Sequence, residues 1–152
     1  MDGIFEGGSA LPANVENVRV APHPKEGFER WVLDFSDKNT RTLNSTAPRF
    51  QIRYVKAEKV SNSMGQETII SAPKFVIPLR SVEKNVLEKA RLKKVVQKSR
   101  YVKEIKVYPQ VEDGDLAFEM LLRDSVQFEP HQPMDREGGL VLDLKNAPLG
   151  TD

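Results

Sequence analysis

The chain has 152 residues, of which 39% are hydrophobic and 30% charged, a composition typical of a globular domain rather than a disordered segment. It contains no cysteine, which excludes a disulfide framework, a thiol nucleophile and a cysteine-ligated zinc site. The net charge of +1 conceals an asymmetry, because residues 1–100 carry 18 Lys and Arg against 11 Asp and Glu, whereas residues 101–152 carry 5 against 11. Either the two parts attract each other or the basic part faces an anionic partner.

The two ends of the chain differ in pattern from its middle. Residues 1–14 are rich in turn-forming residues and are predicted to be a flexible N-terminal arm, and residues 147–152 are predicted to be a tail. The arm shows neither the basic start nor the apolar core of a signal peptide, and no run of the chain approaches the roughly 18 apolar residues of a membrane span. A single domain is therefore expected over residues 15–146.

The first part of this domain has the alternation of apolar and polar residues that is typical of strands. In FERWVLDF, for example, Trp31, Leu33 and Phe35 lie on one face of the expected strand. Polar segments with turn-forming residues separate the strands. Strands are predicted near residues 15–22, 28–35, 49–55 and 68–80.

One helix is predicted, from Ser81 to Lys98, with Ser81 as its N-cap, acidic residues in the first turn and lysines towards its end. Val82, Leu92 and Val96 belong to its apolar stripe. Its basic face is either simply solvated or a patch for an anionic polymer, and the lack of interleaved aromatic residues argues against nucleic acid. The basic residues are Lys84, Lys89, Arg91, Lys93, Lys94 and Lys98.

The last part of the domain repeats the first. Four more strands are predicted, near residues 102–109, 116–124, 126–130 and 140–146. An offset of 87 aligns Val18 with Ile105, Val20 with Val107, Pro22 with Pro109, Trp31 with Phe118, Leu33 with Met120 and Phe35 with Leu122.

This repeat predicts the fold class. Residues 15–80 and 102–146 are two four-stranded units, and each would form a sheet with one apolar face that needs covering. Packing the two inner faces together gives a mainly β protein, a pseudo-twofold β-sandwich with the basic helix 81–98 linking its units.

The same motifs resemble a known family. A basic strand ended by proline, a polar turn, the strand WVLDF and the closing strand LVLDL are similar to those of the AMIN domain, the non-catalytic module of bacterial cell-wall amidases and type IV pilus secretins. The resemblance covers about residues 15–146 and departs from the pattern at Pro78, which stands where the second unit has Asp143. It implies a peptidoglycan-binding module of the periplasm or cell envelope that positions a partner.

The sequence contains few candidate catalytic residues. His23 and His131 lie in proline-flanked loops without partners at metal-ligand spacing, so neither a metal nor another cofactor is expected. Asp34 and Glu119 could in principle form the carboxylate pair of a glycosidase, although carboxylates on strand surfaces are far more often solvated. A protein without enzymatic activity is therefore expected.

The outward strand faces carry the candidate ligand-binding residues. Guanidinium groups bind carboxylates in fork geometry, and the stem peptides of peptidoglycan carry carboxylates. Arg19, Arg30 and Arg53 have the same outward phase and are predicted to share one sheet face, which Asp34 or a bound anion would neutralise. The predicted binding residues are Arg19, Arg30, Asp34, Arg53, Lys106, Tyr108, Glu119 and Arg123.

Two functions follow from these patterns. The first is a non-enzymatic envelope module that binds peptidoglycan and positions a partner. The alternative is a protein–protein docking domain of a pilus or secretion assembly that makes no glycan contact.

Overall fold

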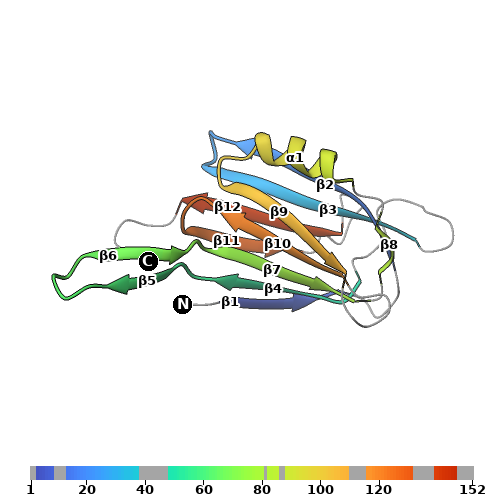
Figure 1. Ribbon diagram of the computed structural model, residues 1–152. Coiled ribbons are helices and arrows are strands. Elements are labelled where there is room, and N and C mark those ends of the chain that lie inside the picture. The colour runs from blue at the N-terminus through green and yellow to red at the C-terminus, as the bar shows by residue number, and fades with distance from the viewer. Residues whose placement is uncertain are drawn as a thin grey trace.

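A computed structural model describes residues 3–8, 13–37, 48–80, 82–85, 88–109, 116–131 and 139–146. Over these residues the protein is mainly β, with antiparallel sheets of five, four and two strands, an additional parallel edge strand, and one short helix (Figure 1). The elements are β1 (Gly3–Gly7), β2 (Ala13–His23), β3 (Phe28–Asp37), β4 (Phe50–Val55), β5 (Glu58–Ser61), β6 (Glu67–Ser71), β7 (Lys74–Leu79), β8 (Val82–Asn85), α1 (Lys89–Gln97), β9 (Val102–Pro109), β10 (Leu116–Leu122), β11 (Val126–His131) and β12 (Leu140–Asn146).

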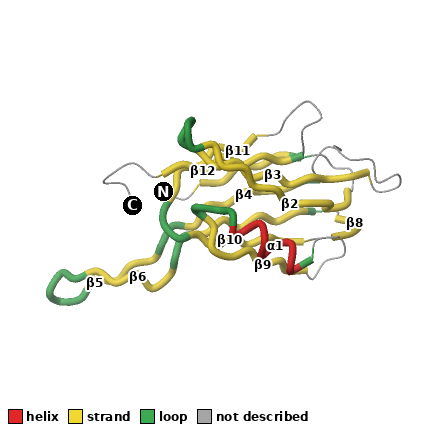
Figure 2. Tube along the Cα trace, turned by 90° about the horizontal axis from the view of Figure 1, so that it is seen from above, coloured by secondary structure: helices red, strands yellow, loops and turns green. Residues whose placement is uncertain are grey.

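Two large sheets face each other (Figure 2). Sheet I has the strand order β1-β4-β7-β10-β9. Sheet II has the order β11-β12-β3-β2, and β8 extends it by pairing in parallel with β2. Strands β5 and β6 form a separate hairpin.

A single hydrophobic core fills the space between the sheets, because alternate residues of each strand point inward. Trp31 and Phe35 of sheet II are fully buried, as is Phe75 of sheet I. Across the two sheets, the ring of Phe128 in β11 lies 5.4 Å from that of Tyr54 in β4 and 5.0 Å from that of Phe75 in β7, measured between centroids. These contacts hold the open edge of sheet II against sheet I.

All eight strands predicted from alternation are present, as β2, β3, β4, β7, β9, β10, β11 and β12. Their distribution differs from the expectation that each unit forms one sheet. The first unit places β2 and β3 in sheet II and β4 and β7 in sheet I, whereas the second places β9 and β10 in sheet I and β11 and β12 in sheet II. Each unit therefore spans both layers, and each large sheet combines strands from both units.

The two long hairpins share their register. In β2–β3, Val18 lies opposite Leu33, and in β9–β10, Ile105 lies opposite Met120, so the offset of 87 relates both partners of the pair. The same offset relates the pair Val20 and Trp31 to the pair Val107 and Phe118. The sequence repeat thus corresponds to equivalent strand pairs in opposite sheets.

The predicted helix is wrong over residues 82–85. The helix α1 begins at Lys89, its N-cap Glu88 makes no side-chain capping hydrogen bond, and the predicted N-cap Ser81 lies outside the described residues. Residues 82–85 instead form β8, because β2 would otherwise leave an unpaired edge and tertiary pairing overrides a weak helix propensity. The short α1 lies against β9 and β2 and buries Leu92, Val95 and Val96.

Two further strands, β1 and β5, were not predicted. Part of the expected N-terminal arm forms β1, which pairs with β4 over its whole length. Strand β5 precedes the polar stretch that was expected to be a connection, and the single strand expected over residues 68–80 is divided into β6 and β7. Residues 13 and 14 of the arm belong to β2, whereas residues 1–2 and 9–12 and the predicted tail lie outside the described residues.

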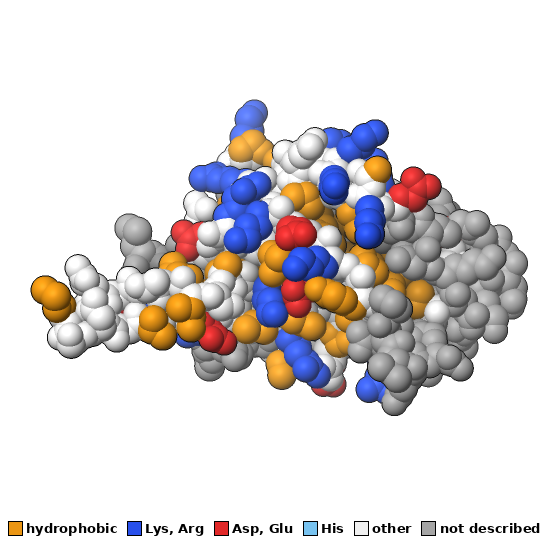
Figure 3. Space-filling view, viewed as in Figure 1, with side chains coloured by type: hydrophobic (Ala, Val, Ile, Leu, Met, Phe, Trp, Pro, Cys, Tyr) orange, Lys and Arg blue, Asp and Glu red, His pale blue; other side chains and the backbone are white. Residues whose placement is uncertain are grey.

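The β5–β6 hairpin protrudes from the body of the protein, and apolar side chains gather along it (Figures 1 and 3). Its turn is built by Asn62, whose side-chain oxygen accepts hydrogen bonds from the backbone N–H groups of Met64 and Gln66, both at 2.9 Å. The turn holds Met64 at its tip with 82% of its surface exposed. The other exposed large apolar residues of the hairpin are Val60, Ile69 and Ile70.

Candidate anion-binding site

Sheet I carries a hollow of about 610 Å³ at the end where β1 and β7 finish and β4 begins. Three arginines line it, together with one carboxylate and two consecutive glycines. The lining residues are Glu6, Gly7, Gly8, Arg49, Phe50, Gln51, Arg53, Pro78 and Arg80. We call this hollow the arginine pocket.

Strand alternation explains why the arginines meet there. In β4, Phe50 and Ile52 are buried in the core, so Arg49 and Arg53 lie on the outward phase. The backbone N–H of Arg80 donates to the carbonyl of Arg49 at 2.8 Å, which extends the pairing of β4 and β7 and sets the two arginines opposite each other. Like charges in opposite positions destabilise a sheet.

Among the described residues, no acidic side chain forms an ion pair with these arginines. Within the described parts of the chain, the guanidinium groups of Arg49 and Arg80 have no hydrogen-bond acceptor and no ion-pair partner. The guanidinium of Arg53 donates to the side-chain oxygen of Gln51, a neutral group, at 2.9 and 2.6 Å. All three arginines are exposed, so an incoming anion can reach them.

A glycine shapes one wall of the pocket. Gly8 has φ of +95°, a conformation that residues with a side chain rarely adopt, and a Cβ at this position would lie 2.1 Å from the carbonyl oxygen of Pro48. Only glycine allows β1 to end so close to the segment that leads into β4. The absence of side chains at Gly7 and Gly8 also leaves this wall bare beside the arginines.

The outer face of sheet I continues from the pocket through residues that the sequence predicted to bind. Arg53, Val76, Glu119 and Lys106 lie in one row across β4, β7, β10 and β9. Tyr108 lies on the same face of β9 and is 43% exposed, while Glu119 pairs with Lys74 at 3.2 Å. The exposed Arg123 follows the end of β10.

The other predicted residues lie on the opposite side of the molecule, so the prediction that Arg19, Arg30 and Arg53 share one face is wrong. Arg19 and Arg30 project from the outer face of sheet II, because their strands β2 and β3 belong to that sheet. Arg19 donates two hydrogen bonds to Asp34, at 2.7 and 2.9 Å. The sequence could not show that the first unit divides between two sheets.

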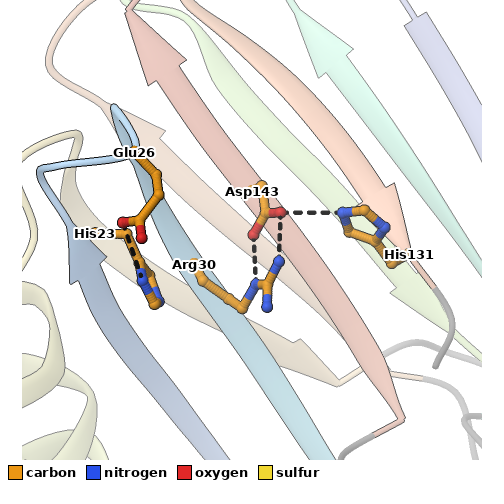
Figure 4. Close-up of polar contacts among 5 residues, drawn as sticks. All are labelled: His23, Glu26, Arg30, His131 and Asp143. Atoms are coloured by element: carbon orange, nitrogen blue, oxygen red, sulfur yellow. Dashed lines mark hydrogen bonds and ion pairs between the residues drawn. The ribbon is translucent and has the colours of Figure 1, made fainter.

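Arg30 is neutralised in a second fork. It donates to both carboxylate oxygens of Asp143, at 2.8 and 2.9 Å, and His131 lies 3.0 Å from the same carboxylate on its other side (Figure 4). Burial alone raises the pKa of Asp143, but the hydrogen bonds and charges of Arg30 and His131 outweigh burial and hold this pKa below its ordinary value of 3.8. Arg19 and Arg30 of sheet II therefore form ion pairs within the fold, whereas the arginines of the arginine pocket form none with the described residues.

The remaining expectations concern catalysis and metals. Asp34 lies on the outer face of sheet II and Glu119 on that of sheet I, so these two carboxylates cannot flank one glycosidic bond. Among the described residues, no group of three or more His, Asp or Glu side chains is arranged to hold a metal ion. The described helix is neither long nor apolar enough to cross a membrane.

Comparison with known proteins finds no matching family model and no matching curated protein.

Sequence reasoning missed Arg49, Arg80 and Glu6. Alternation alone places Arg49 in phase with Arg53, so the signal for that residue was present in RFQIR. Arg80 joins them only through the antiparallel register of β4 and β7, and Glu6 only through the pairing of β1 with β4. Neither pairing can be derived from periodicity.

Proposed function

We propose that this protein is a non-enzymatic module of the bacterial envelope that binds peptidoglycan through the arginine pocket and positions a partner. The observation that carries the proposal is the set of three arginines, Arg49, Arg53 and Arg80, that converge without an acidic partner among the described residues. Stem peptides present carboxylates, and a carboxylate accepts paired hydrogen bonds from a guanidinium group. Peptidoglycan repeats this ligand many times, so weak single contacts add up along the polymer.

The resemblance to the AMIN domain supports the same proposal. We further propose the finer description of the fold, a pseudo-twofold β-sandwich, because replacing each strand of β4-β7-β10-β9 by its repeat equivalent gives the order β11-β12-β3-β2. The shared register of the two long hairpins agrees with this symmetry. Strands β1 and β8 are then additions at the edges, and β1 contributes Glu6, Gly7 and the adjoining Gly8 to one pocket.

The test is co-sedimentation with purified insoluble peptidoglycan at low and high salt. We expect the wild type to pellet at low salt and less at high salt, because exposed charges are screened. The triple variant Arg49→Ala/Arg53→Ala/Arg80→Ala should bind about tenfold more weakly or worse, as three exposed contacts of about 0.5–1 kcal/mol each would give.

The matched control is Lys89→Ala/Lys93→Ala/Lys94→Ala, which removes the same charge from exposed positions of α1. Alanine suits a helix, so this variant should fold and pellet like the wild type. Equal loss in both triple variants would place the binding in overall charge or in the basic helix. A wild type that stays in the supernatant at low salt would refute peptidoglycan binding.

One observation favours the alternative, a protein–protein docking domain. The β5–β6 hairpin exposes Val60, Met64, Ile69 and Ile70, and an isolated two-stranded sheet needs a further strand or layer for stability in water. Its natural partner is an extended segment of another envelope protein, which would pair with the free edge of β6 and cover the two isoleucines. Crosslinking from the exposed position 68 of β6 in envelope extracts, compared between the otherwise wild-type chain and Ile69→Ser/Ile70→Ser, tests this docking, and the arginine-pocket variant serves as its control.

A further inference from the structure

Glu6 is the one lining residue whose charge opposes that of the arginines in the arginine pocket. Its carboxylate forms no ion pair with Arg49, Arg53 or Arg80, although all four side chains border the same hollow. A glutamate that served only to neutralise the pocket would be expected to pair directly with an arginine.

Gln51 explains this separation. Its side-chain N–H donates to Oε1 of Glu6 at 2.8 Å, and its side-chain oxygen accepts from Arg53 at 2.9 and 2.6 Å. The amide of Gln51 therefore lies between the two charges and fixes both in position. The pocket has a cationic side and an anionic side held apart by a neutral bridge.

A pocket with separated charges of both signs is complementary to a ligand that also carries both. The free N–H donors of the arginines suit a carboxylate, and the second carboxylate oxygen of Glu6 has no described partner and suits an ammonium group. A ligand with a carboxylate alone would be repelled by Glu6, whereas one with a neighbouring amine would be attracted.

We infer that the arginine pocket recognises an amino-carboxylate, a group with a free ammonium beside a free carboxylate, and that Glu6 is the residue that selects for the amine. This inference rests on the proposed function and names its ligand more closely. Peptide cross-linking consumes a side-chain amine of the stem peptide by converting it to an amide. The protein should therefore prefer regions of the wall whose stem peptides are not cross-linked.

Acetylation of the free amines of purified insoluble peptidoglycan tests the inference, because it removes the ammonium groups and leaves the carboxylates. We expect the wild type to pellet at least about fivefold less with the acetylated polymer. The variant Glu6→Gln keeps the hydrogen bond from Gln51 but lacks the negative charge, so acetylation should leave its binding unchanged. Gly65→Ala, far from the pocket in the β5–β6 turn, is the control for handling and should respond to acetylation like the wild type.

A soluble probe gives an independent reading. In an NMR titration of the full chain, the backbone signals of Gly7 and Gly8 should shift at lower concentrations of D-alanine than of N-acetyl-D-alanine, and Glu6→Gln should abolish or invert this order. Equal binding of native and acetylated polymer by the wild type would overturn the inference and leave the proposed function standing. No sedimentation with either polymer would overturn both, and a stronger response to inorganic phosphate than to D-alanine would replace the amino-carboxylate by a phosphoryl ligand.

Discussion

At the scale of single residues, two glycines with the same backbone handedness differ in their surroundings. Gly8 and Gly65 have φ of +95° and +82°, but a Cβ at Gly8 would meet the backbone of Pro48, whereas a Cβ at Gly65 would meet nothing within 4 Å. We expect Gly65→Ala to cost about 1 kcal/mol for its conformation alone. Gly8→Ala should cost clearly more, because Pro48 or β1 must also move.

Urea unfolding of the two variants against the wild type measures this difference. A displacement of β1 also displaces Glu6 in the pocket wall. Gly8→Ala should therefore weaken peptidoglycan binding, and Gly65→Ala should not. Equal losses of stability in the two variants would mean that β1 does not pack against Pro48 as described.

The ion pairs of Asp143 should make the stability of the protein depend on pH. Its pKa is lowered in the folded protein, so its contribution to stability is fully present above the unfolded-state value of 3.8 and is lost as the pH falls through the folded-state value. The stability advantage of the wild type over Asp143→Asn should therefore shrink below about pH 4. Urea unfolding between pH 2.5 and 6 checks this, with the exposed, non-titrating Gln127→Ala as the reference. An advantage that stays constant to the lowest pH would contradict the prediction.

At the scale of elements, the equivalent hairpins β2–β3 and β9–β10 should be equally important to the core. Leu33 and Met120 are repeat equivalents, 4% and 2% exposed, in opposite sheets. Changing either to alanine should lower the free energy of unfolding by about 2–5 kcal/mol. Met64→Ala at the exposed hairpin tip is the matched control and should stay within about 0.5 kcal/mol of the wild type. If thermal melts gave Met120→Ala the same melting temperature as Met64→Ala, the packed core between the sheets would be ruled out.

Strands could be predicted from the sequence, whereas features that depend on distant pairing could not. Alternation in segments such as FERWVLDF identified eight strands, because a period of two is a local signal that does not depend on the partner. The predicted start of the helix was wrong because residues 82–85 pair as a strand with the edge of β2, which lies about 70 residues away in the chain. The prediction of a shared arginine face was wrong for the same reason. Arg19 and Arg53 have the same outward phase, but their strands belong to different sheets.

At the scale of the whole molecule, each repeat unit relies on the other for neighbouring strands in both large sheets. Strand β3 of the first unit pairs with β12 of the second, and β7 pairs with β10. Residues 13–80 produced alone would leave Trp31 and Phe75 without the strands that cover them. We expect this fragment to show no cooperative unfolding by circular dichroism, in contrast to the full chain. A sharp two-state melt of the fragment would show that one unit can bury its own core.

The distribution of charge over the folded molecule differs from its distribution along the sequence. The sequence located basic and acidic charge in successive parts of the chain, whereas the fold redistributes it between two outer faces. On sheet II, Arg19 and Arg30 are matched by Asp34 and Asp143. On sheet I, the arginine pocket remains positive at one end, so the two faces are suited to different neighbours.

The place of β12 in sheet II has a consequence for synthesis. This strand lies between β11 and β3, and it pairs Leu140 with Leu33, more than 100 residues earlier in the chain. On a ribosome adding about 5–20 residues per second, the β2–β3 hairpin would wait on the order of 5–20 s for that partner. During this interval the free edge of β3 and its apolar face would be exposed to other nascent chains. Production of the protein should therefore depend on chaperones that shield β3, and slow elongation between residues 34 and 140 should lower the soluble yield.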